Sequence, residues 1–409
     1  MQIIYNISIN VYGLIIRFAA LFNKKAKLWV EGRKNILEKI PNNTGKSMFI
    51  NWFHCASLGE FEQGRPLIEK LKEKYPHEKI FVTFYSPSGY EIRKNYAFAD
   101  WVSYLPLDRK KNMQEFIGKI NPSRVFIIKY ELWFNMLNVL TEKKTPTYLI
   151  SGKFRKEQIF FASGGSWFFE KLRKAFTHFF VQDEVSKNLL QIHGIENSSI
   201  VGDTRIDRVM EHSKNPQKFP TLEKLLVGKK VIIGGSIWDK ENEFLLQYKN
   251  KIDDDTIIIL APHEVNESRI KSLQKQWAES VLWSDIDQQN ICPKIILINC
   301  IGILSSLYQY GNVAVIGGGF NASIHNILEP AAFGLPVLFG PKHYKFDEAS
   351  AMINNGSGFC FEKFEKFSSS LNSILQSAEL RTQIKENQLE YLNSQSGATE
   401  KILSLLLQI

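Results

Sequence analysis

Two acidic residues follow expected strands: Glu60, which could accept a proton, and Glu131, which could orient the acceptor or support Glu60. Glu60 ends the segment H-C-A-S-L-G-E, residues 54–60, which lies between an expected buried strand and an expected helix. Glu131 follows a later strand in the same way. A carboxylate at a strand-to-helix turn can act as a general base when its pKa is suitable. Two structural alternatives stay open, because Glu60 could only complement the helix dipole and Glu131 could only begin the next helix.

Two further loops bring polar side chains to the same edge of the expected sheet. S-P-S-G, residues 86–89, follows the second strand and supplies hydroxyls, while G-K-F-R, residues 152–155, follows a later strand and supplies cations. The carboxyl ends of parallel strands meet at one edge, so we expect these groups near the two carboxylates. A solvated basic loop is an equally good account of Lys153 and Arg155.

A second group of residues has the layout of a phosphate or nucleotide pocket. An apolar strand at residues 312–316 ends in a run of glycines, 317–319, and glycine lets backbone N–H groups approach a ligand. A helix expected at residues 326–333 would offer its N-terminus to an anion. Asn326 and Glu329 are also spaced as in a capping box, so a purely structural role stays open. The spacing is not G-x-G-x-x-G, which gives a dinucleotide fold little support.

Two more loops are expected at the same end of the second sheet. G-G-S, residues 234–236, comes after the expected first strand of that sheet, and A-P-H-E, residues 261–264, comes after its second strand. His325 stands beside Asn326. A lone histidine is more often structural than catalytic, so His263 is of interest only through its place in the loop.

The elements that must position these residues alternate between strands and helices, as in parallel α/β sheets. Strands are expected at residues 48–53, 79–84, 124–128, 147–151 and 178–182, and again at 230–233, 256–260, 295–298, 313–316 and 337–339. Helices are expected at residues 62–75, from residue 89 and at 183–193. A polar, proline-marked segment, residues 212–221, reads as a linker. The pattern predicts an α/β protein with two doubly wound, Rossmann-like domains and a cleft between them.

The composition fits an ordinary globular protein without metal chemistry. A chain of 409 residues is too long for one ordinary core and fits two domains of roughly 200 residues each. The four cysteines, at residues 55, 292, 300 and 360, have no metal-binding spacing and no disulfide framework is expected, so we expect reduced thiols. No group of His, Cys, Asp and Glu has convincing metal spacing either. We therefore expect neither a metal nor a cofactor.

The beginning of the chain suggests an anionic partner. Residues 1–60 hold eight Lys or Arg against three Glu, and the whole chain has a formal net charge of +9. No zinc spacing, RNP-like motif or basic helix with interleaved aromatic residues indicates nucleic acid. The first 22 residues are apolar but interrupted by polar ones, and they lack the features of a removed signal peptide. We expect residues 1–25 to lie on a membrane surface, with Trp29 and the nearby lysines at the headgroups; a core helix is the alternative.

Five motifs in a fixed order carry a family resemblance. They are H-C-A-S-L-G-E at 54–60, F-Y-S-P-S-G at 84–89, Y-E-L-W at 130–133, G-D-T-R-I-D at 202–207 and the run from Glu329 to Pro341. Over nearly its whole length the chain resembles the Kdo transferases, which add 3-deoxy-D-manno-octulosonic acid (Kdo) to the lipid A precursor of lipopolysaccharide. The resemblance implies the GT-B fold, acceptor binding in the N-terminal domain, CMP-Kdo binding in the C-terminal domain, and work at the cytoplasmic face of the inner membrane.

The resemblance also implies roles for single residues. Glu60 matches the family's proposed general base and Glu131 its second acidic residue, whereas Lys129 stands where many members have an acidic residue. The expected donor-binding residues are Ser236, His263, Gly318, Gly319, His325, Asn326 and Glu329. The expected acceptor-binding residues are Ser57, Gly59, Ser86, Ser88, Lys153 and Arg155. The expected parts are a membrane-associated segment at 1–25, an acceptor domain at 26–211, a donor domain at 222–379, and a final helix within 380–409 that crosses back towards the first domain.

The predicted function is transfer of Kdo from CMP-Kdo to the lipid A precursor, with inversion, without a metal, and with Glu60 as the base. Another GT-B enzyme, such as a UDP-sugar 2-epimerase, or a non-catalytic lipid-binding relative would share the fold. The apolar N-terminus argues against the epimerase, and the presence of both carboxylates argues against the inactive relative. No motif encodes the number of Kdo residues added, the preferred acylation and phosphorylation of the acceptor, or the oligomeric state.

Overall fold

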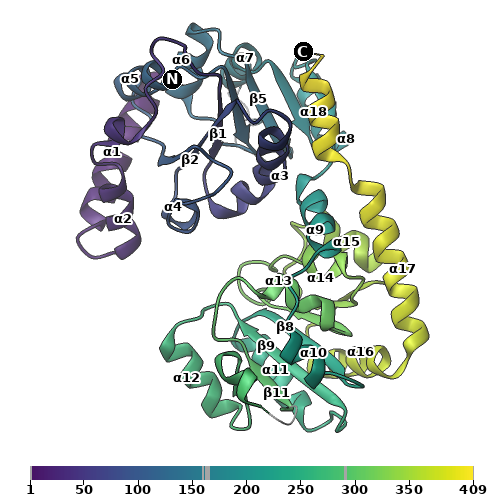
Figure 1. Cartoon of the computed structure of the whole chain (residues 1–409). Helices are drawn as coiled ribbons and strands as arrows, with labels where there is room; N and C mark the ends of the chain where they lie inside the picture. Colours follow the sequence, from purple (N-terminus) through teal and green to yellow (C-terminus); the bar gives the residue numbers. More distant parts are fainter. Residues whose placement is uncertain (1, 159–160, 162–165, 290–292, 409) are drawn as a thin grey trace. The chain divides into compact units, whose positions relative to one another are not determined.

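The chain forms two compact units, each built on its own parallel sheet (Figure 1). The computed structural model describes residues 2–158, 161, 166–289 and 293–408. The first unit comprises Met1–Asp207 together with Ser396–Ile409, and the second comprises Arg208–Gln395. Cys55, Cys300 and Cys360 are free cysteines, and Cys292 lies outside the described residues.

The sheet of the first unit has seven parallel strands in the order β3-β2-β1-β4-β5-β6-β7. The strands are β1 (Ile50–Cys55), β2 (Lys79–Phe84), β3 (Trp101–Tyr104), β4 (Arg124–Ile128), β5 (Thr147–Gly152), β6 (His178–Val181) and β7 (Ser198–Ile200). The strand order runs outwards in both directions from the pair β1 and β4, whose register aligns Trp52 with Val125 and Phe53 with Phe126. In doubly wound sheets, ligands bind beside the carboxyl ends of the strands at such a reversal.

Helices cover both faces of this sheet because successive strand residues point to opposite sides. Trp52 packs in one apolar layer with Phe81 and Phe116, and Phe53 packs in the other with Phe61 and Phe126. The helices of the unit are α1 (Gln2–Ala19), α2 (Lys24–Gly32), η1 (Ile36–Lys39), α3 (Leu58–Lys74), α4 (Pro87–Arg93), α5 (Lys110–Ile120), α6 (Phe134–Glu142), α7 (Ser166–Ala175), α8 (Glu184–Ile192), α18 (Ala398–Leu406) and the start of α9 (Thr204–Lys214).

The second unit repeats this plan, with the strand order β10-β11-β9-β8-β12-β13-β14 and all neighbours parallel. Its strands are β8 (Lys230–Ile237), β9 (Thr256–Pro262), β10 (Val281–Leu282), β11 (Ile295–Leu297), β12 (Val313–Ile316), β13 (Val337–Phe339) and β14 (Gly358–Cys360). Its helices are α10 (Pro220–Leu225), α11 (Asp239–Lys249), α12 (Glu267–Gln276), η3 (Trp283–Gln288), α13 (Leu304–Leu307), η4 (Tyr308–Tyr310), α14 (Leu328–Ala332), α15 (Asp347–Asn354), α16 (Phe364–Gln376) and α17 (Ala378–Gln395). Here the order reverses between β8 and β12.

The apolar start of the chain forms helix α1, which lies against α2 on the first unit and is drawn in purple (Figure 1). Ile9 and Gly13 are buried, and the Tyr5 hydroxyl donates a hydrogen bond of 2.6 Å to Asp108. Most other apolar residues of the segment are exposed, including Ile15 at 61%, Phe18 at 68% and Phe22 at 81%. No described helix combines the length and the hydropathy needed to cross a membrane. The helix is thus attached to the core along one side only.

The C-terminal region contains two helices rather than one. Helix α17 packs in the second unit, where the buried Gln388 donates to the carbonyls of Leu335 and Ser357. Helix α18 belongs to the first unit and contacts α3 through Ile402, Leu403 and Leu406, which join the apolar layer of that face. The division between the two units therefore falls at Gln395 and Ser396, not at residue 380.

Three other sequence expectations differ from the structure. The segment 212–221 is not a continuous linker, because α9 runs to Lys214 and α10 begins at Pro220. The helix after β1 begins at Leu58 instead of residue 62. The edge strands β3, β7, β10 and β14 were missed, since they are two to four residues long and only partly buried. The ten expected strands are all present, with ends shifted by at most a few residues.

Candidate active site

The two candidate carboxylates flank the point where the first sheet reverses its strand order. Glu60 lies in the first turn of α3, which follows β1, and Glu131 lies three residues after β4. Because β1 and β4 are neighbours, both residues lie at the carboxyl edge of the same strand pair. This is the position in which doubly wound sheets bind ligands.

Glu60 has the properties of a base that works near neutral pH. Its carboxylate accepts a hydrogen bond from the Ala56 backbone N–H, and the side chain is largely buried. Burial raises the pKa of Glu60 to about 7, and the negative charge of Glu131 adds to the increase, while the Ala56 N–H and the Lys129 ammonium oppose it. A carboxyl group with such a pKa is near half-ionised at pH 7, which suits proton transfer.

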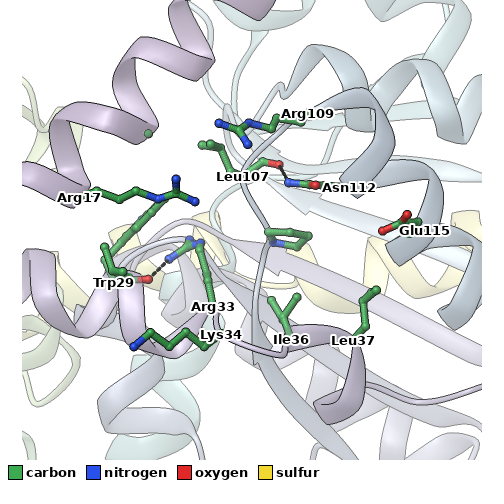
Figure 2. A pocket seen from close by; sticks show the side chains of 13 residues that line it. Arg17, Trp29, Arg33, Lys34, Ile36, Leu37, Leu107, Arg109, Asn112 and Glu115 are labelled. Atoms are coloured by element: carbon green, nitrogen blue, oxygen red, sulfur yellow. Dashed lines mark hydrogen bonds between the residues drawn. The ribbon is translucent and has the colours of Figure 1, made fainter.

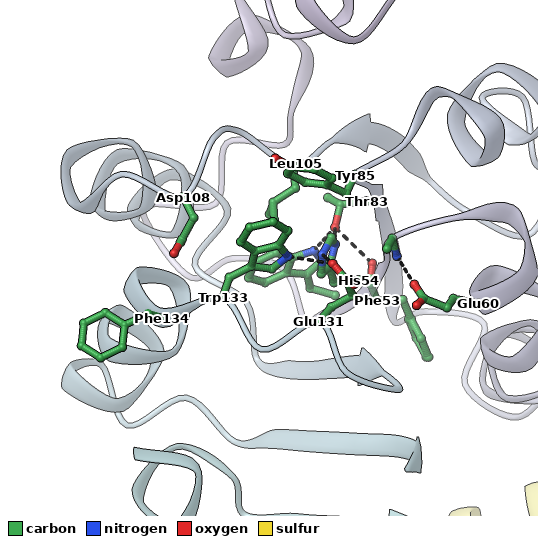
Figure 3. A network of polar contacts seen from close by, with 12 residues as sticks. Phe53, His54, Glu60, Thr83, Tyr85, Leu105, Asp108, Glu131, Trp133 and Phe134 are labelled. Atoms are coloured by element: carbon green, nitrogen blue, oxygen red, sulfur yellow. Dashed lines mark hydrogen bonds and ion pairs between the residues drawn. The ribbon is translucent and has the colours of Figure 1, made fainter. Parts of the chain in front are cut away.

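Glu131 is oriented by a continuous polar network that crosses three strands (Figure 3). The indole N–H of Trp133 donates to Glu131 Oε2 at 2.8 Å, and His54 Nε2 lies 3.7 Å from the same oxygen. On its other side, His54 Nδ1 is 2.9 Å from the Thr83 hydroxyl, which accepts a hydrogen bond from the Trp52 indole at 2.8 Å. The Thr83 hydroxyl also donates to the Phe53 carbonyl at 3.4 Å. The network thus joins Glu131, His54 and Thr83 across β1 and β2.

Lys129 brings a buried cation to the same edge. Its backbone has φ of +59°, a left-handed conformation that costs a non-glycine residue energy and is typical of functional sites. Burial lowers the pKa of Lys129 and the cation of Arg205 lowers it further, while Asp203 and Glu60 raise it. Arg205 in turn donates to Asp203 Oδ2 through Nε at 2.9 Å. The motif G-D-T-R-I-D thus supplies an ion pair beside Lys129.

The residues expected to bind the acceptor lie at this edge. Ser57 is the N-cap residue of α3, and Gly59 lies in the same turn as Glu60, with open space where a Cβ would be. Ser86 caps α4 by accepting the Ser88 N–H, and the two hydroxyls are 3.0 Å apart, so both also have a structural role. Lys153 and Arg155 follow β5. The charge of Lys153 acts on Lys129 and that of Arg155 on Tyr130, which places both at the edge that carries Glu131.

In the second unit, three aromatic side chains form a stack at the point where the strand order reverses. The ring of Trp238 lies 4.6 Å from that of His263, which lies 4.4 Å from the ring of His325. The Trp238 indole donates to His325 Nε2 at 2.8 Å. Burial lowers the pKa of His325 to about 4, and the proximity of His263 adds to this shift. His325 is therefore neutral at pH 7, with its ring proton on Nδ1.

Ser236 lies inside a strand and not after it. Strand β8 continues to Ile237, and the register with β9 shifts between Gly234 and Ile237. Ser236 has φ of +52° within this irregularity. A bulge of this kind re-aims side chains at the rim of a sheet. It places Trp238 directly after the strand, next to the two histidines.

The glycine run is shaped by the protein's own backbone. A Cβ on Gly317 would lie 2.1 Å from the Ser236 carbonyl oxygen, and one on Gly318 would lie 2.4 Å from that of Ser323. Gly319 packs equally tightly against Gly340. Burial raises the pKa of the Glu241 carboxyl, and the nearby amides of Gly318 and Phe320 oppose this shift only in part. The expectation that these glycines are small in order to admit a ligand is therefore incomplete, because internal packing already requires them.

The helix after the glycine run is shorter than expected. Helix α14 spans Leu328–Ala332, where residues 326–333 were predicted. Asn326 accepts the Leu328 N–H at 3.0 Å and donates to the Glu329 carboxylate at 3.1 Å. The N-cap of α14 is Ile327, which makes no side-chain cap hydrogen bond, and the contact between Glu329 and Asn326 joins their side chains, so the expected capping box is not formed. A role of both residues in donor binding stays a prediction.

Some candidate residues were not found from the sequence. Trp238, Thr83 and Glu241 complete the contacts described above, yet none had been singled out. An aromatic residue after a strand of the reversal point was a usable signal for Trp238, whereas Thr83 and Glu241 are ordinary residues of a strand and a helix. Among the described residues, no group of three or more His, Cys, Asp or Glu side chains could hold a metal ion.

Comparison with known proteins agrees with the motifs of the first unit. The family model of 3-deoxy-D-manno-octulosonic-acid transferase matches residues 26–208. The Kdo transferase of Chlamydia pneumoniae is 26% identical over 364 residues, 84% of this chain and 81% of its own length. That of Aquifex aeolicus is 24% identical over 83% of this chain and 90% of its own length. The matched domain and these relatives support the Kdo transferase family for this chain, and with it glycosyltransferase activity.

Two other comparisons define how far the likeness extends. A bifunctional glycosyltransferase/methyltransferase of Fusobacterium nucleatum is 26% identical over 84% of this chain, which spans 56% of that longer protein. The solved structure of the UDP-GlcNAc 2-epimerase of Neisseria meningitidis, bound to UDP-GlcNAc, matches 88% of the chain with a TM-score of 0.61 at 16% identity. This structural likeness concerns the fold alone. Together with the two parallel sheets, it identifies the GT-B fold in this chain.

Proposed function

We propose that the chain transfers Kdo from CMP-Kdo to a hydroxyl of the lipid A precursor in lipopolysaccharide synthesis, with Glu60 as the general base. The observation that carries this proposal is the buried Glu60 carboxylate, whose pKa is raised to about 7 at the strand reversal of the first unit. The match to the Kdo transferase family supports Kdo as the sugar. CMP-Kdo as the donor and the lipid as the acceptor are part of the proposal.

The proposed reaction is a single displacement. Glu60 takes the proton of the attacking hydroxyl, and the oxygen forms a bond to the anomeric carbon of Kdo. The bond from that carbon to the phosphate oxygen of CMP breaks, and CMP leaves with the electron pair. Attack from the side opposite the leaving group inverts the configuration. Burial and, after it, the charge of Glu131 keep the pKa of Glu60 high, so that the base is not permanently ionised.

We assign donor binding to the second unit and propose that no metal takes part. The stack of Trp238, His263 and His325 offers an aromatic surface to a nucleobase, and Ser236 lies beside it. His263 is exposed and Lys342, whose carbonyl accepts the Ile324 N–H next to His325, is exposed as well; we assign both to the phosphate as polar and cationic groups. The proposed location is the cytoplasmic face of the inner membrane, supported by the exposed apolar side of α1 and the basic residues that follow it.

The test is an assay of the detergent-solubilised protein in EDTA, with CMP-Kdo made in situ and a tetraacylated lipid A precursor. Wild-type protein should yield products heavier by one or more Kdo residues, which mass spectrometry counts. Glu60→Gln should lower kcat at least about 100-fold. Glu73→Gln is the matched control, since Glu73 lies on the same helix but is 70% exposed. Full activity of Glu60→Gln would refute the assigned base. No product beside a working transferase would instead favour a UDP-sugar 2-epimerase or an inactive lipid binder.

A further inference from the structure

A cavity of about 410 Å³ in the first unit is lined almost entirely by cations and apolar groups (Figure 2). It lies between α1, α2 and the chain that leads into α5. Four basic side chains line it: Arg17, Arg33, Lys34 and Arg109. Glu115 is the one acidic residue in its lining, and this carboxylate lies 3.9 Å from Lys111. The cavity therefore carries a large excess of positive charge.

None of the four cations forms an ion pair with any residue that the structure describes. The side chains of Arg17 and Lys34 are exposed, whereas those of Arg33 and Arg109 are half-buried. Buried cations normally have an anionic partner, because removing a charge from water is costly. The cavity thus offers several cationic groups that no described carboxylate neutralises.

Arg33 is fixed in place without being neutralised. Its Nη2 donates to the Tyr85 carbonyl at 2.7 Å, its Nε to that of Leu105 at 2.8 Å and its Nη1 to that of Trp29 at 3.1 Å. The guanidinium also lies 3.8 Å from the centre of the Trp29 ring. Burial lowers the pKa of Arg33 to about 9. An anion in the cavity would stabilise this charged guanidinium further.

Two N–H donors of the lining are buried and have no hydrogen-bond partner among the described residues: Trp29 Nε1 and Arg109 Nε. Buried N–H donors without an acceptor are rare in folded proteins. No described residue accepts a hydrogen bond from either of these two N–H groups. Gly13 allows the close approach of α1 to this wall, since a Cβ there would lie 2.6 Å from the Leu107 side chain. Several arginine donors and an indole N–H around one space form an environment that suits phosphate oxygens.

The cavity is also connected to the candidate active site. Arg33 holds the Tyr85 carbonyl, and the Tyr85 ring stacks on Trp133 at 4.5 Å. Trp133 in turn donates to Glu131. The helix that forms the other wall carries exposed apolar residues next to the cavity, among them Leu14 and Phe18. A ligand that fits both features has a phosphate head and apolar chains.

We propose that this cavity binds a phosphate monoester on the head group of the acceptor lipid, while the acyl chains lie along the exposed side of α1. This inference rests on the proposed function, because it assigns a subsite for the acceptor of that reaction. The phosphate would complete the hydrogen bonds of Trp29 and Arg109 and neutralise Arg33. The cavity residues thereby position the acceptor hydroxyl and do not take part in proton transfer.

The experiment compares two acceptors in the transfer assay, the tetraacylated disaccharide with its phosphates and the same lipid after removal of its phosphates. The variant Arg17→Gln/Arg109→Gln removes two charges and spares the fixed Arg33. With the phosphorylated acceptor, its KM should rise about 10- to 100-fold with little change in kcat. With the dephosphorylated acceptor, variant and wild type should have similar KM values. Lys110→Gln/Lys143→Gln is the control, because both lysines are exposed and do not line the cavity.

Equal KM increases for both acceptors, or an unchanged KM for the phosphorylated one, would overturn the inference while leaving Kdo transfer intact. If wild-type protein shows no transfer, co-sedimentation with lipid vesicles in the absence of donor tests the phosphate site separately from Kdo transfer. Phosphatidylcholine vesicles that carry the phosphorylated disaccharide lipid should bind wild type more strongly than the cavity variant, and vesicles that carry phosphatidylglycerol should not distinguish them. A monoester site would be contradicted if wild type and the cavity variant bound equally to vesicles with the phosphorylated disaccharide lipid. It would also be contradicted if the variant lost as much binding to vesicles with phosphatidylglycerol.

Discussion

The carboxylates of Glu60 and Glu131 are electrostatically coupled: the charge of Glu131 is, after burial, the largest cause of the raised pKa of Glu60. The two residues come from turns after adjacent strands, β1 and β4, so the fold itself maintains their proximity. Glu131 is held by Trp133 and faces His54, whereas Glu60 is held by the amide of Ala56. Different partners therefore give one carboxylate a fixed position and the other a pKa suited to proton exchange.

The first consequence concerns the pH dependence of transfer. A base must be ionised to act, and the pKa of Glu60 is raised to about 7. We expect kcat/KM to increase with a slope of about one in logarithmic units below pH 7 and to level off above it. Initial rates at a limiting concentration of acceptor, measured from pH 5 to pH 9, would show this acid limb. A rate that is already constant at pH 5 would mean that the base has an ordinary carboxyl pKa.

The second prediction isolates the coupling. Glu131→Gln removes a negative charge but retains an oxygen that can accept from Trp133, so the pKa of Glu60 should fall. The acid limb of the pH–rate profile should consequently move to lower pH, even if the maximal rate decreases. The matched control is Glu142→Gln, which removes a carboxylate from α6 at the surface and should leave the profile in place. A limb that does not move in Glu131→Gln would show that burial alone sets the pKa.

The raised pKa of Glu60 has a cost in stability. The folded protein binds this proton more tightly than the unfolded chain, whose carboxyl has the ordinary value near 4.5. The stabilising contribution is present below that value and is lost as the pH rises through about 7. The side chain of the Glu60→Gln variant does not titrate, so the variant avoids this loss. The unfolding free energy of the variant minus that of wild type should therefore be about 2 kcal/mol larger at pH 8 than at pH 5. Urea titrations at the two pH values measure it, and equal differences would contradict the raised pKa.

Much of this site could be predicted because it follows from strand order. The positions of Glu60 and Glu131 after buried strands were visible in the sequence, and the parallel sheet brings the turns together. The network behind Glu131 could not be predicted in this way. Thr83 lies in the middle of β2, and its contact with His54 depends on the alignment of β1 with β2, which pairs these two residues. Register is set by the whole sheet and not by local residue types.

For the glycine run, residues 317–319, the sequence indicated the shape of the backbone but not what occupies the space beside it. The spacing correctly indicated a tight backbone path, but the close neighbours of Gly317 and Gly318 are carbonyls of Ser236 and Ser323. One of these carbonyls belongs to the bulge of β8, about 80 residues earlier in the chain. A sequence pattern can show that a Cβ is excluded, whereas only the packed structure shows whether protein or ligand occupies that space.

The attachment of the C-terminal helix provides a prediction about local stability. Asp207 accepts the backbone N–H groups of Gly397 and Thr399, both at 2.6 Å, at the start of α18. Asp207→Ala removes this cap, which should cost about 1 to 2 kcal/mol and reduce the hydrogen-exchange protection of α18 roughly tenfold. Glu400→Gln on the same helix is the control, since Glu400 is exposed. Unchanged exchange in Asp207→Ala would mean that the apolar contacts with α3 alone hold the helix.

The last prediction concerns the stack in the second unit. The pKa of His325 is lowered to about 4 by burial and by His263, and Nε2 accepts the Trp238 N–H. Trp238→Phe removes that donor and part of the cover, so the pKa of His325 should rise towards its ordinary value of 6.5. His263→Gln should also raise it, because the second cause of the shift disappears. Histidine ring signals in NMR spectra, followed from pH 4 to pH 8, report both changes, with the exposed His77 of the first unit as internal control.

The direction of this shift has a consequence for stability that tests the same contact independently. A depressed histidine pKa means that the stabilising contribution is present above pH 6.5 and is lost as the pH falls through about 4. Trp238→Phe should therefore cost more unfolding free energy at pH 7, where the neutral ring accepts the hydrogen bond, than at pH 4, where protonation already competes with it. A cost that is equal at both pH values would show that Trp238 acts on the second unit only through packing and that its hydrogen bond to His325 contributes nothing measurable.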